Sequence, residues 1–182
     1  ELAAQIAWDT TVELAEGCGI LAERPPLDVI RRVNARSFAA RLEQRRLADS
    51  TVLASVRSVD QVEQVLSRLA GASAGWIFKS EHGNAGLGNR RLRRWPLDPA
   101  DRRLLETMLA EDVGGGVETW RDRVVDLCTT FELGPEGELR HLELHEAVTT
   151  AEGAFLGALF ATGSPVVEPW RAQLEQVAEE VA

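Results

Sequence analysis

The chain has 182 residues, of which 45% are hydrophobic and 27% are charged. This composition is typical of a globular protein with one ordinary domain or two small lobes, and it excludes an intrinsically disordered chain. The net charge of −9 lies mainly in residues 111–182, which carry 4 basic and 15 acidic side chains, so nucleic acid is not expected as the main partner.

Hydrophobic periodicity and capping residues predict the secondary-structure elements. In chain order these are helices over 2–16 and 27–46, a strand at 51–56, a helix over 59–71, strands at 75–79 and 90–93, a helix over 97–112, a strand at 114–120, a hairpin over 123–150, a strand at 153–161 and a helix over 167–182. Ser58 and Asp98 precede two of these helices and are predicted N-caps. The order of the elements indicates an α+β fold.

This order also predicts the domain organisation. Residues 1–48 are expected to form a helical segment, 49–93 a first lobe of antiparallel sheet, and 94–182 a second lobe that is incomplete at its C-terminus. The chain begins without Met and without the basic start of a signal peptide, so we expect it to be a fragment of a longer protein. No apolar run approaches the roughly 20 residues that span a bilayer, so no membrane partner is expected.

Side chains that bind metals are few and poorly spaced for the purpose. Cys18 and Cys128 lie in unrelated contexts, and we expect free thiols, which are typical of a cytoplasmic protein. His141, Glu143 and His145 share one strand face by alternation, but at the strand rise the two histidines are roughly 13 Å apart and cannot bind one ion together. We expect a polar strand face over a cleft here and assign no metal ligand.

The stretch that indicates a specific chemistry is GWIFKSEHGNAGLGNRRL, residues 75–92. A short apolar strand ends in Lys79, the only lysine of the chain, and a glycine-rich loop follows. The lysine precedes the glycines, which excludes a Walker A loop. No third glycine follows Gly86 and Gly88 at a helix start, which excludes a dinucleotide-binding loop.

A loop of this kind suits an anion. Gly83, Gly86 and Gly88 can adopt positive φ and turn their N–H groups toward a phosphate. Lys79, fixed at the strand end, would add a point charge over a phosphate oxygen. A loose hairpin with an incidental lysine is the alternative interpretation.

The predicted strand after the loop is rich in arginine. Arg91 and Arg93 share one face, while Arg90 and Arg94 fall on the other. This pattern is compatible with two arrangements: one arginine face turned toward phosphates, or both faces exposed to solvent. The five tryptophans have no stacking period, and we expect them to pack in the core or between lobes.

The strand, lysine and loop resemble the nucleotide-covering hairpin of the ATP-grasp superfamily, typically V-V-K-P-x-x-G-x-x-G-x-G. Upstream, VNARSF places Arg36 forty-three residues before Lys79, at a position where the family usually has lysine. Downstream, GVETW supplies Glu118 and Trp120, which resemble the family's acidic residue and the aromatic whose backbone reads the adenine edge. Asp126 then matches a polar side chain that the family often places near the ribose.

The chain departs from the family pattern at the start of the loop. Ser80, Glu81 and His82 replace the usual segment that begins with proline. Glu81 beside a triphosphate would be repulsive unless it pointed to solvent. Arg36 keeps the charge of the usual lysine but has a planar head with different geometry.

The resemblance covers residues 33–182 and implies an ATP-dependent ligase that joins a small carboxylate substrate to an amine through an acyl phosphate. It implies ATP and Mg²⁺ as cofactors, with the Mg²⁺ ligands outside this chain, and it assigns no catalytic residue. A non-catalytic nucleotide-binding module and a ligand-free interaction domain are the alternatives. The implied nucleotide-binding residues are Arg36, Lys79, Gly83, Asn84, Gly86, Gly88, Glu118, Trp120, Arg121 and Asp126.

Overall fold

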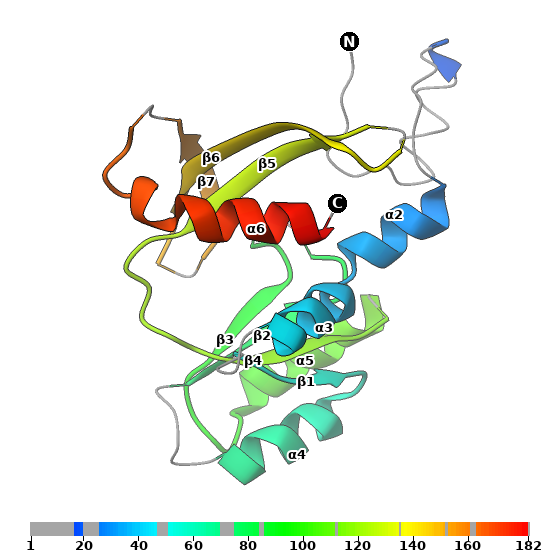
Figure 1. The fold of residues 1–182 in the computed structure, drawn as a ribbon. Coiled ribbons are helices and arrows are strands. Elements are labelled where there is room, and N and C mark those ends of the chain that lie inside the picture. Colours follow the sequence, from blue (N-terminus) through cyan, green and yellow to red (C-terminus); the bar gives the residue numbers. More distant parts are fainter. Residues whose placement is uncertain are drawn as a thin grey trace. The chain divides into compact units, whose positions relative to one another are not determined.

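The computed structural model describes residues 17–19, 26–46, 51–69, 75–83, 86–111, 113–134, 136–151, 153–160 and 163–181 (Figure 1). The helix expected over 2–16 lies outside these residues. The chain divides into two compact units, Glu1–Asn84 with Gly88–Trp120, and Ala85–Leu87 with Arg121–Ala182. In the described part of the chain, no helix is long and apolar enough to span a membrane.

The first unit contains a four-stranded antiparallel sheet in the order β1-β4-β2-β3. Its strands are β1 (Val52–Val56), β2 (Trp76–Ser80), β3 (Asn89–Leu92) and β4 (Gly115–Thr119). The predicted strands are therefore present, but their spatial order is not their chain order. Because β4 lies between β1 and β2, the first unit includes β4 and extends to Trp120.

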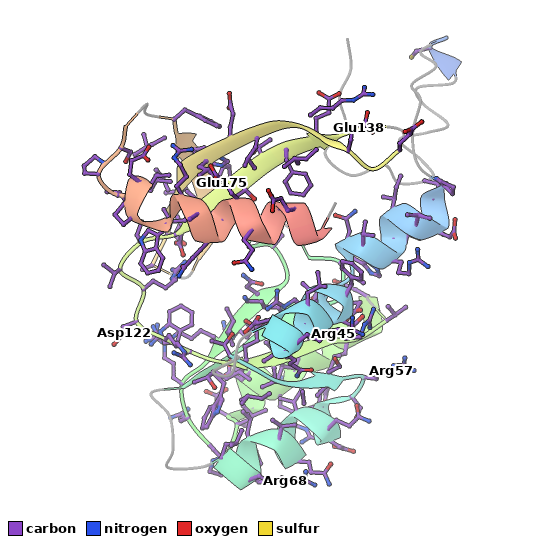
Figure 2. The ribbon with its side chains drawn as sticks, viewed as in Figure 1. Arg45, Arg57, Arg68, Asp122, Glu138 and Glu175 are labelled. Carbon is purple, nitrogen blue, oxygen red and sulfur yellow. The ribbon has the colours of Figure 1, made fainter. Side chains whose placement is uncertain are left out.

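Two helices, α4 (Val59–Leu69) and α5 (Pro99–Glu111), contribute to the hydrophobic core of this unit. Their apolar positions pack with alternate residues of the sheet, and the fully buried members include Val62, Leu66, Phe78, Leu92, Leu105 and Val117. We call this side of the sheet the core face. Charged side chains of the unit, such as Arg68 on α4, extend away from it (Figure 2).

Both predicted N-caps of these helices are confirmed. The Ser58 hydroxyl accepts a hydrogen bond from the Gln61 N–H at 3.3 Å. The Asp98 carboxylate accepts from the N–H groups of Ala100 and Asp101 at 3.0 and 2.8 Å. These bonds satisfy N–H groups that have no partner within the first helical turn.

The helix predicted over 27–46 is interrupted. It consists of α2 (Leu27–Asn34) and α3 (Arg36–Arg46), and Ala35 between them is extended, with φ −70° and ψ 135°. In a continuous helix the Arg36 N–H would donate to the carbonyl four residues earlier. It donates instead to the Glu81 carbonyl at 2.7 Å, so a tertiary contact starts a new helix here.

The second unit is an antiparallel sheet in the order β5-β6-β7 with a helix packed on it. Its strands are β5 (Leu127–Leu133), β6 (Leu139–Thr149) and β7 (Phe155–Leu159). The hairpin predicted over 123–150 is confirmed, and its turn contains Gly137 at φ 84°. The helix α6 (Arg171–Val181) packs against β5 and β6.

Candidate functional site

The candidate site lies on the face of the first sheet opposite the core, which we call the α3 face. Alternation along β2 turns Trp76 and Phe78 to the core face and therefore Ile77 and Lys79 to the α3 face. Across the ladder, Ile77 pairs with Glu118 of β4 and Lys79 with Gly116. Lys79 and Glu118 are consequently diagonal neighbours on one face, a distance that long side chains bridge.

Three of the predicted residues meet in an ion-pair cluster on this face. The Lys79 Nζ lies 2.8 Å from Glu118 Oε2, and an Arg36 Nη2 pairs with the other carboxylate oxygen of Glu118. The Glu118 side chain is 5% exposed, whereas those of Arg36 and Lys79 are 22% and 30% exposed. Glu118 thus holds two cations at the end of the strand that leads into the glycine loop.

A second carboxylate, which sequence reasoning did not single out, fixes the helix that carries Arg36. Glu43 Oε1 accepts hydrogen bonds from the N–H and the hydroxyl of Thr51 at 2.7 and 2.8 Å. Its Oε2 lies 3.8 Å from Arg36 Nη2. These contacts tie α3 to the start of β1, and they stabilise Arg36 over the sheet between two carboxylates.

Glycines at the start of β4 let the helix and the neighbouring strand approach. A Cβ at Gly116 would lie 3.4 Å from the Arg36 Cγ, and one at Gly115 would collide with the Lys79 carbonyl. A side chain at Gly115 would therefore force β2 and β4 apart beside Lys79, whereas one at Gly116 would only touch Arg36. The run of glycines before Glu118 is therefore part of the cluster's geometry.

The glycine-rich loop is closed at its base by backbone hydrogen bonds. The Ser80 N–H donates to the Gly88 carbonyl at 2.9 Å, and the Gly83 N–H donates to the Ser80 carbonyl at 3.4 Å. Gly86 and Gly88 have the positive φ expected of them, 84° and 80°, whereas Gly83 does not. Asn84 lies outside the described residues.

Glu81 is held at the start of α3 by its carboxylate and does not simply extend into solvent. Its Oε1 accepts a hydrogen bond from the Ser37 N–H at 3.2 Å, and its backbone N–H donates to the Gly114 carbonyl at 2.9 Å. The carboxylate thus caps the N-terminus of α3, where unpaired N–H groups and the helix dipole favour negative charge. This contact also explains why Glu81 is compatible with a site that is otherwise basic.

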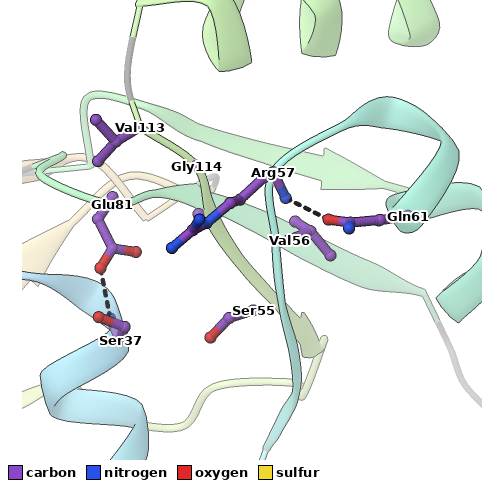
Figure 3. Close-up of a pocket in the computed structure, with 9 residues that line it drawn as sticks. Ser37, Ser55, Val56, Arg57, Gln61, Glu81, Val113 and Gly114 are labelled. Atoms are coloured by element: carbon purple, nitrogen blue, oxygen red, sulfur yellow. Dashed lines mark hydrogen bonds between the residues drawn. The ribbon is translucent and has the colours of Figure 1, made fainter.

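A polar cavity of about 480 Å³ lies beside this cap, within the first unit (Figure 3). Its lining comes from the end of β1, the first turns of α3 and α4, the residue after β2 and the start of β4. It consists of Ser37, Ser55, Val56, Arg57, Gln61, Glu81, Val113, Gly114 and Gly115. Gln61 accepts a hydrogen bond from the Arg57 N–H at 2.6 Å and fixes the rim. The cavity offers one cation and one carboxylate, so its lining is close to neutral.

Of the arginines after the loop, Arg91 lies on the α3 face. It pairs with Ile77 in the ladder, and its guanidinium carbon lies 4.0 Å from the centre of the Trp120 ring. Arg90 points to the core face, where its Nε donates to the buried Asp101 carboxylate at 2.8 Å. The backbone N–H of Trp120 donates a hydrogen bond to the Gly75 carbonyl at 3.0 Å, so this backbone donor is already paired within the first unit.

The remaining predicted residues, Gly86, Arg121 and Asp126, belong to the second unit. Asp126 Oδ2 accepts hydrogen bonds from the Thr149 hydroxyl at 2.6 Å and from Arg123 Nη1 at 2.9 Å. Arg123 also donates to the carbonyl of Thr150, the residue after β6, at 3.0 Å. In this unit Asp126 therefore helps to fix the β6–β7 turn.

The expected polar face of β6 is only partly polar. His145 is buried, and its ring centre lies 4.4 Å from that of Phe160. Its cross-strand neighbour is Cys128, a free thiol whose pKa is raised by burial and, to a smaller extent, by the Asp126 carboxylate. Among the described residues, no group of three His, Cys, Asp or Glu side chains is placed to hold a metal ion.

No family model and no curated protein sequence matches the chain. Solved structures do match. They include a biotin carboxylase–β,γ-ATP complex from Campylobacter jejuni (TM-score 0.64, 16% identity, 95% of this chain and 39% of that one). An N5-carboxyaminoimidazole synthetase from Staphylococcus aureus complexed with ADP matches with TM-score 0.59 and 14% identity, over 92% of this chain and 42% of that one.

A third match is the biotin carboxylase domain of the Hydrogenobacter thermophilus 2-oxoglutarate carboxylase, in complex with MgADP, ADP and bicarbonate (TM-score 0.56, 14% identity, 94% of this chain and 39% of that one). The chain spans about two fifths of the length of these proteins. At such identities the likeness establishes the fold alone. The chain has the ATP-grasp fold, which confirms the predicted α+β class and, for the fold, the predicted resemblance.

Proposed function

We propose that the chain binds ATP on the α3 face and forms the nucleotide-binding part of an ATP-dependent ligase that joins a carboxylate to an amine. The observation that carries the proposal is the cluster of Lys79, Arg36 and Glu118 at the mouth of the glycine loop. The similar proteins were solved in complex with ADP, MgADP or β,γ-ATP, which supports a nucleotide as the ligand.

The donor set on the α3 face fits a polyphosphate. Lys79 and Arg36 carry the positive charge that a polyphosphate requires. Glu118 compensates part of this charge without ligand, so the two cations are held in place before a phosphate arrives. Pre-positioned donors of this kind cost no reorganisation when charge develops on the ligand.

In the proposed reaction a carboxylate oxygen of the substrate attacks the γ-phosphorus, and ADP leaves. The amine then attacks the carbonyl carbon of the acyl phosphate, and inorganic phosphate leaves. Phosphoryl transfer depends mostly on positioning and charge stabilisation, which is the role we assign to Lys79 and Arg36. Mg²⁺, when bound, would neutralise charge on the transferring group, and its ligands are expected beyond the described residues.

The base is proposed to lie along the segment from Glu118 to Arg121, and Asp126 to lie near the ribose. We further propose that 49–93 and 94–182 represent the two ATP-grasp lobes and 1–48 a preceding helical segment. Arg121 and Asp126 belong to the second unit, so their assignments remain predictions.

The test is thermal denaturation with and without Mg-ATP, for the wild-type chain and for Lys79→Ala. Ligand at 100 times its Kd adds about 2.7 kcal/mol to the apparent stability of the protein that binds it. The wild type should show the corresponding rise in midpoint, and Lys79→Ala should lose most of it. Arg103→Ala, an exposed change on α5, is the control and should keep the full rise.

Two results would contradict the proposal in different ways. No rise in the wild type argues against a nucleotide site on this chain. An equal rise in the wild type and in Lys79→Ala argues for a site elsewhere, away from the loop and its lysine.

A further inference from the structure

Glu81, the first residue after β2, connects three segments of the first unit. Its backbone N–H donates to the Gly114 carbonyl at 2.9 Å, and its own carbonyl accepts from the Arg36 N–H at 2.7 Å. Its side-chain Oε1 accepts from the Ser37 N–H at 3.2 Å (Figure 3). Both backbone groups and the carboxylate are therefore used where β2, the start of β4 and the start of α3 meet.

The Gly114 side of this junction belongs to the sheet. Gly114 has a φ of 136°, and a Cβ there would lie 2.6 Å from the Val56 carbonyl at the end of β1. The strand that follows, β4, is paired with β1 on one side and with β2 on the other. Glu81 is thus anchored to the sheet, and the element that it positions is α3.

The start of α3 needs an outside partner. Ala35 is extended, so α3 does not continue from α2, and the first N–H groups of a helix have no acceptor within it. The Glu81 carbonyl pairs with the first of these groups, that of Arg36, and the Glu81 carboxylate pairs with the next, that of Ser37. Two bonds to one residue fix the direction of the first turn as well as its place, which a single bond would not do.

Arg36 is the residue of this first turn that lies in the candidate site. Its guanidinium pairs with Glu118, and Glu118 pairs with Lys79, which precedes Glu81 by two residues in β2. The contacts therefore form a closed ring, from Glu81 through Arg36, Glu118 and Lys79 and back along β2. Within this ring Glu81 sets the position of Arg36 relative to Lys79.

We propose that Glu81 is a positioning residue of the nucleotide site, whose carboxylate holds the first turn of α3 so that Arg36 and Lys79 bind the same polyphosphate. This inference rests on the proposed nucleotide site. Its prediction has the opposite sign to that of charge alone. A carboxylate close to Lys79 repels a polyphosphate, so a purely electrostatic role means tighter binding when Glu81 is removed. A positioning role means weaker binding.

Calorimetric titration with Mg-ATP tests the inference on the wild type, Glu81→Ala, Glu81→Gln and the control Glu106→Ala, which removes an exposed carboxylate from α5. We expect Glu81→Ala to bind about fivefold more weakly, the effect of a typical lost helix cap, and the control to bind as the wild type does. Glutamine keeps an oxygen that accepts from the Ser37 N–H, so Glu81→Gln should restore at least the wild-type affinity. Circular dichroism of each variant verifies the fold.

A double-mutant cycle with Arg36→Ala separates positioning from a general loss of structure. Without the Arg36 guanidinium, the cap has no side chain to place in the site. Adding Glu81→Ala to Arg36→Ala should therefore cause no further weakening of Mg-ATP binding. The same fivefold loss in both backgrounds would show that Glu81 acts without Arg36, and it would overturn the inference.

Each remaining outcome overturns a distinct statement. Unchanged or tighter binding of Mg-ATP by Glu81→Ala overturns the positioning role and leaves the nucleotide site standing. Equal weakening in Glu81→Gln and Glu81→Ala overturns the role of the hydrogen bond to the Ser37 N–H. Absence of Mg-ATP binding to the wild type overturns the nucleotide site and the inference together.

Discussion

Replacing Glu118 by glutamine should destabilise the first unit more than removing either of its cationic partners. The carboxylate is almost fully buried and pairs with Lys79 and Arg36. Glutamine keeps the size of the side chain and removes its charge, so two cations remain close together on the α3 face, with only the more distant Glu43 carboxylate beside Arg36.

The magnitude follows from burial. Removing one partner of a fully buried ion pair costs about 3 to 5 kcal/mol, because a charge is left desolvated and unpaired. Lys79 and Arg36 keep some exposure and recover part of their hydration, so for Glu118→Gln we expect a loss of about 2 to 3 kcal/mol. Lys79→Met leaves Glu118 paired with Arg36, and about 1 kcal/mol is expected for it.

Urea unfolding, followed by far-UV circular dichroism, measures both values. The control is Glu106→Gln, which removes an exposed carboxylate paired with Arg102 within α5 and should cost less than about 0.5 kcal/mol. If Glu118→Gln costs no more than the control, or less than Lys79→Met, then Glu118 does not hold the cluster together.

Two further predictions concern the first unit. Arg90→Ala leaves the buried Asp101 carboxylate unpaired and should lower the free energy of chemical unfolding by about 3 kcal/mol. Asp101→Ala should cost less, because the partly exposed Arg90 side chain can rehydrate. A larger loss for Asp101→Ala than for Arg90→Ala would refute this reasoning. Hydrogen bonds from the Asp101 N–H and from Arg94 hold the pKa of Asp98 below 3.8, so its contribution to stability is complete above that pH. The difference in unfolding free energy between wild type and Asp98→Ala should therefore fall only as the pH drops through the lowered pKa, and a difference that grows with acid would contradict it.

Local patterns were sufficient to predict most elements of the fold. The alternation of WIFK, the glycines after it and the capping side chains of Ser58 and Asp98 act over a few residues, and the corresponding elements are present. The pairing of Lys79 with Glu118 agrees with residues that the ATP-grasp resemblance had grouped together.

What the sequence did not reveal depends on contacts between distant segments. The break at Ala35 arises because Glu81, more than forty residues later, captures the first N–H groups of α3. The central place of β4 and the stacking of Arg91 on Trp120 depend on the order of strands in space. The spatial order of the strands cannot be predicted from local periodicity. From the sequence, the arginines after the loop could therefore be assigned only to two alternating strand faces, without their contacts.

The hydrogen bond from the Ser80 N–H to the Gly88 carbonyl affects how loops can be exchanged between members of this fold. The ATP-grasp pattern usually has proline at this position, and proline has no N–H to donate. In this chain the Ser80 N–H therefore continues the pairing of β2 and β3 beyond the Lys79–Asn89 pair. Grafting a proline-containing loop onto this scaffold would remove this hydrogen bond and end the pairing at Lys79 and Asn89.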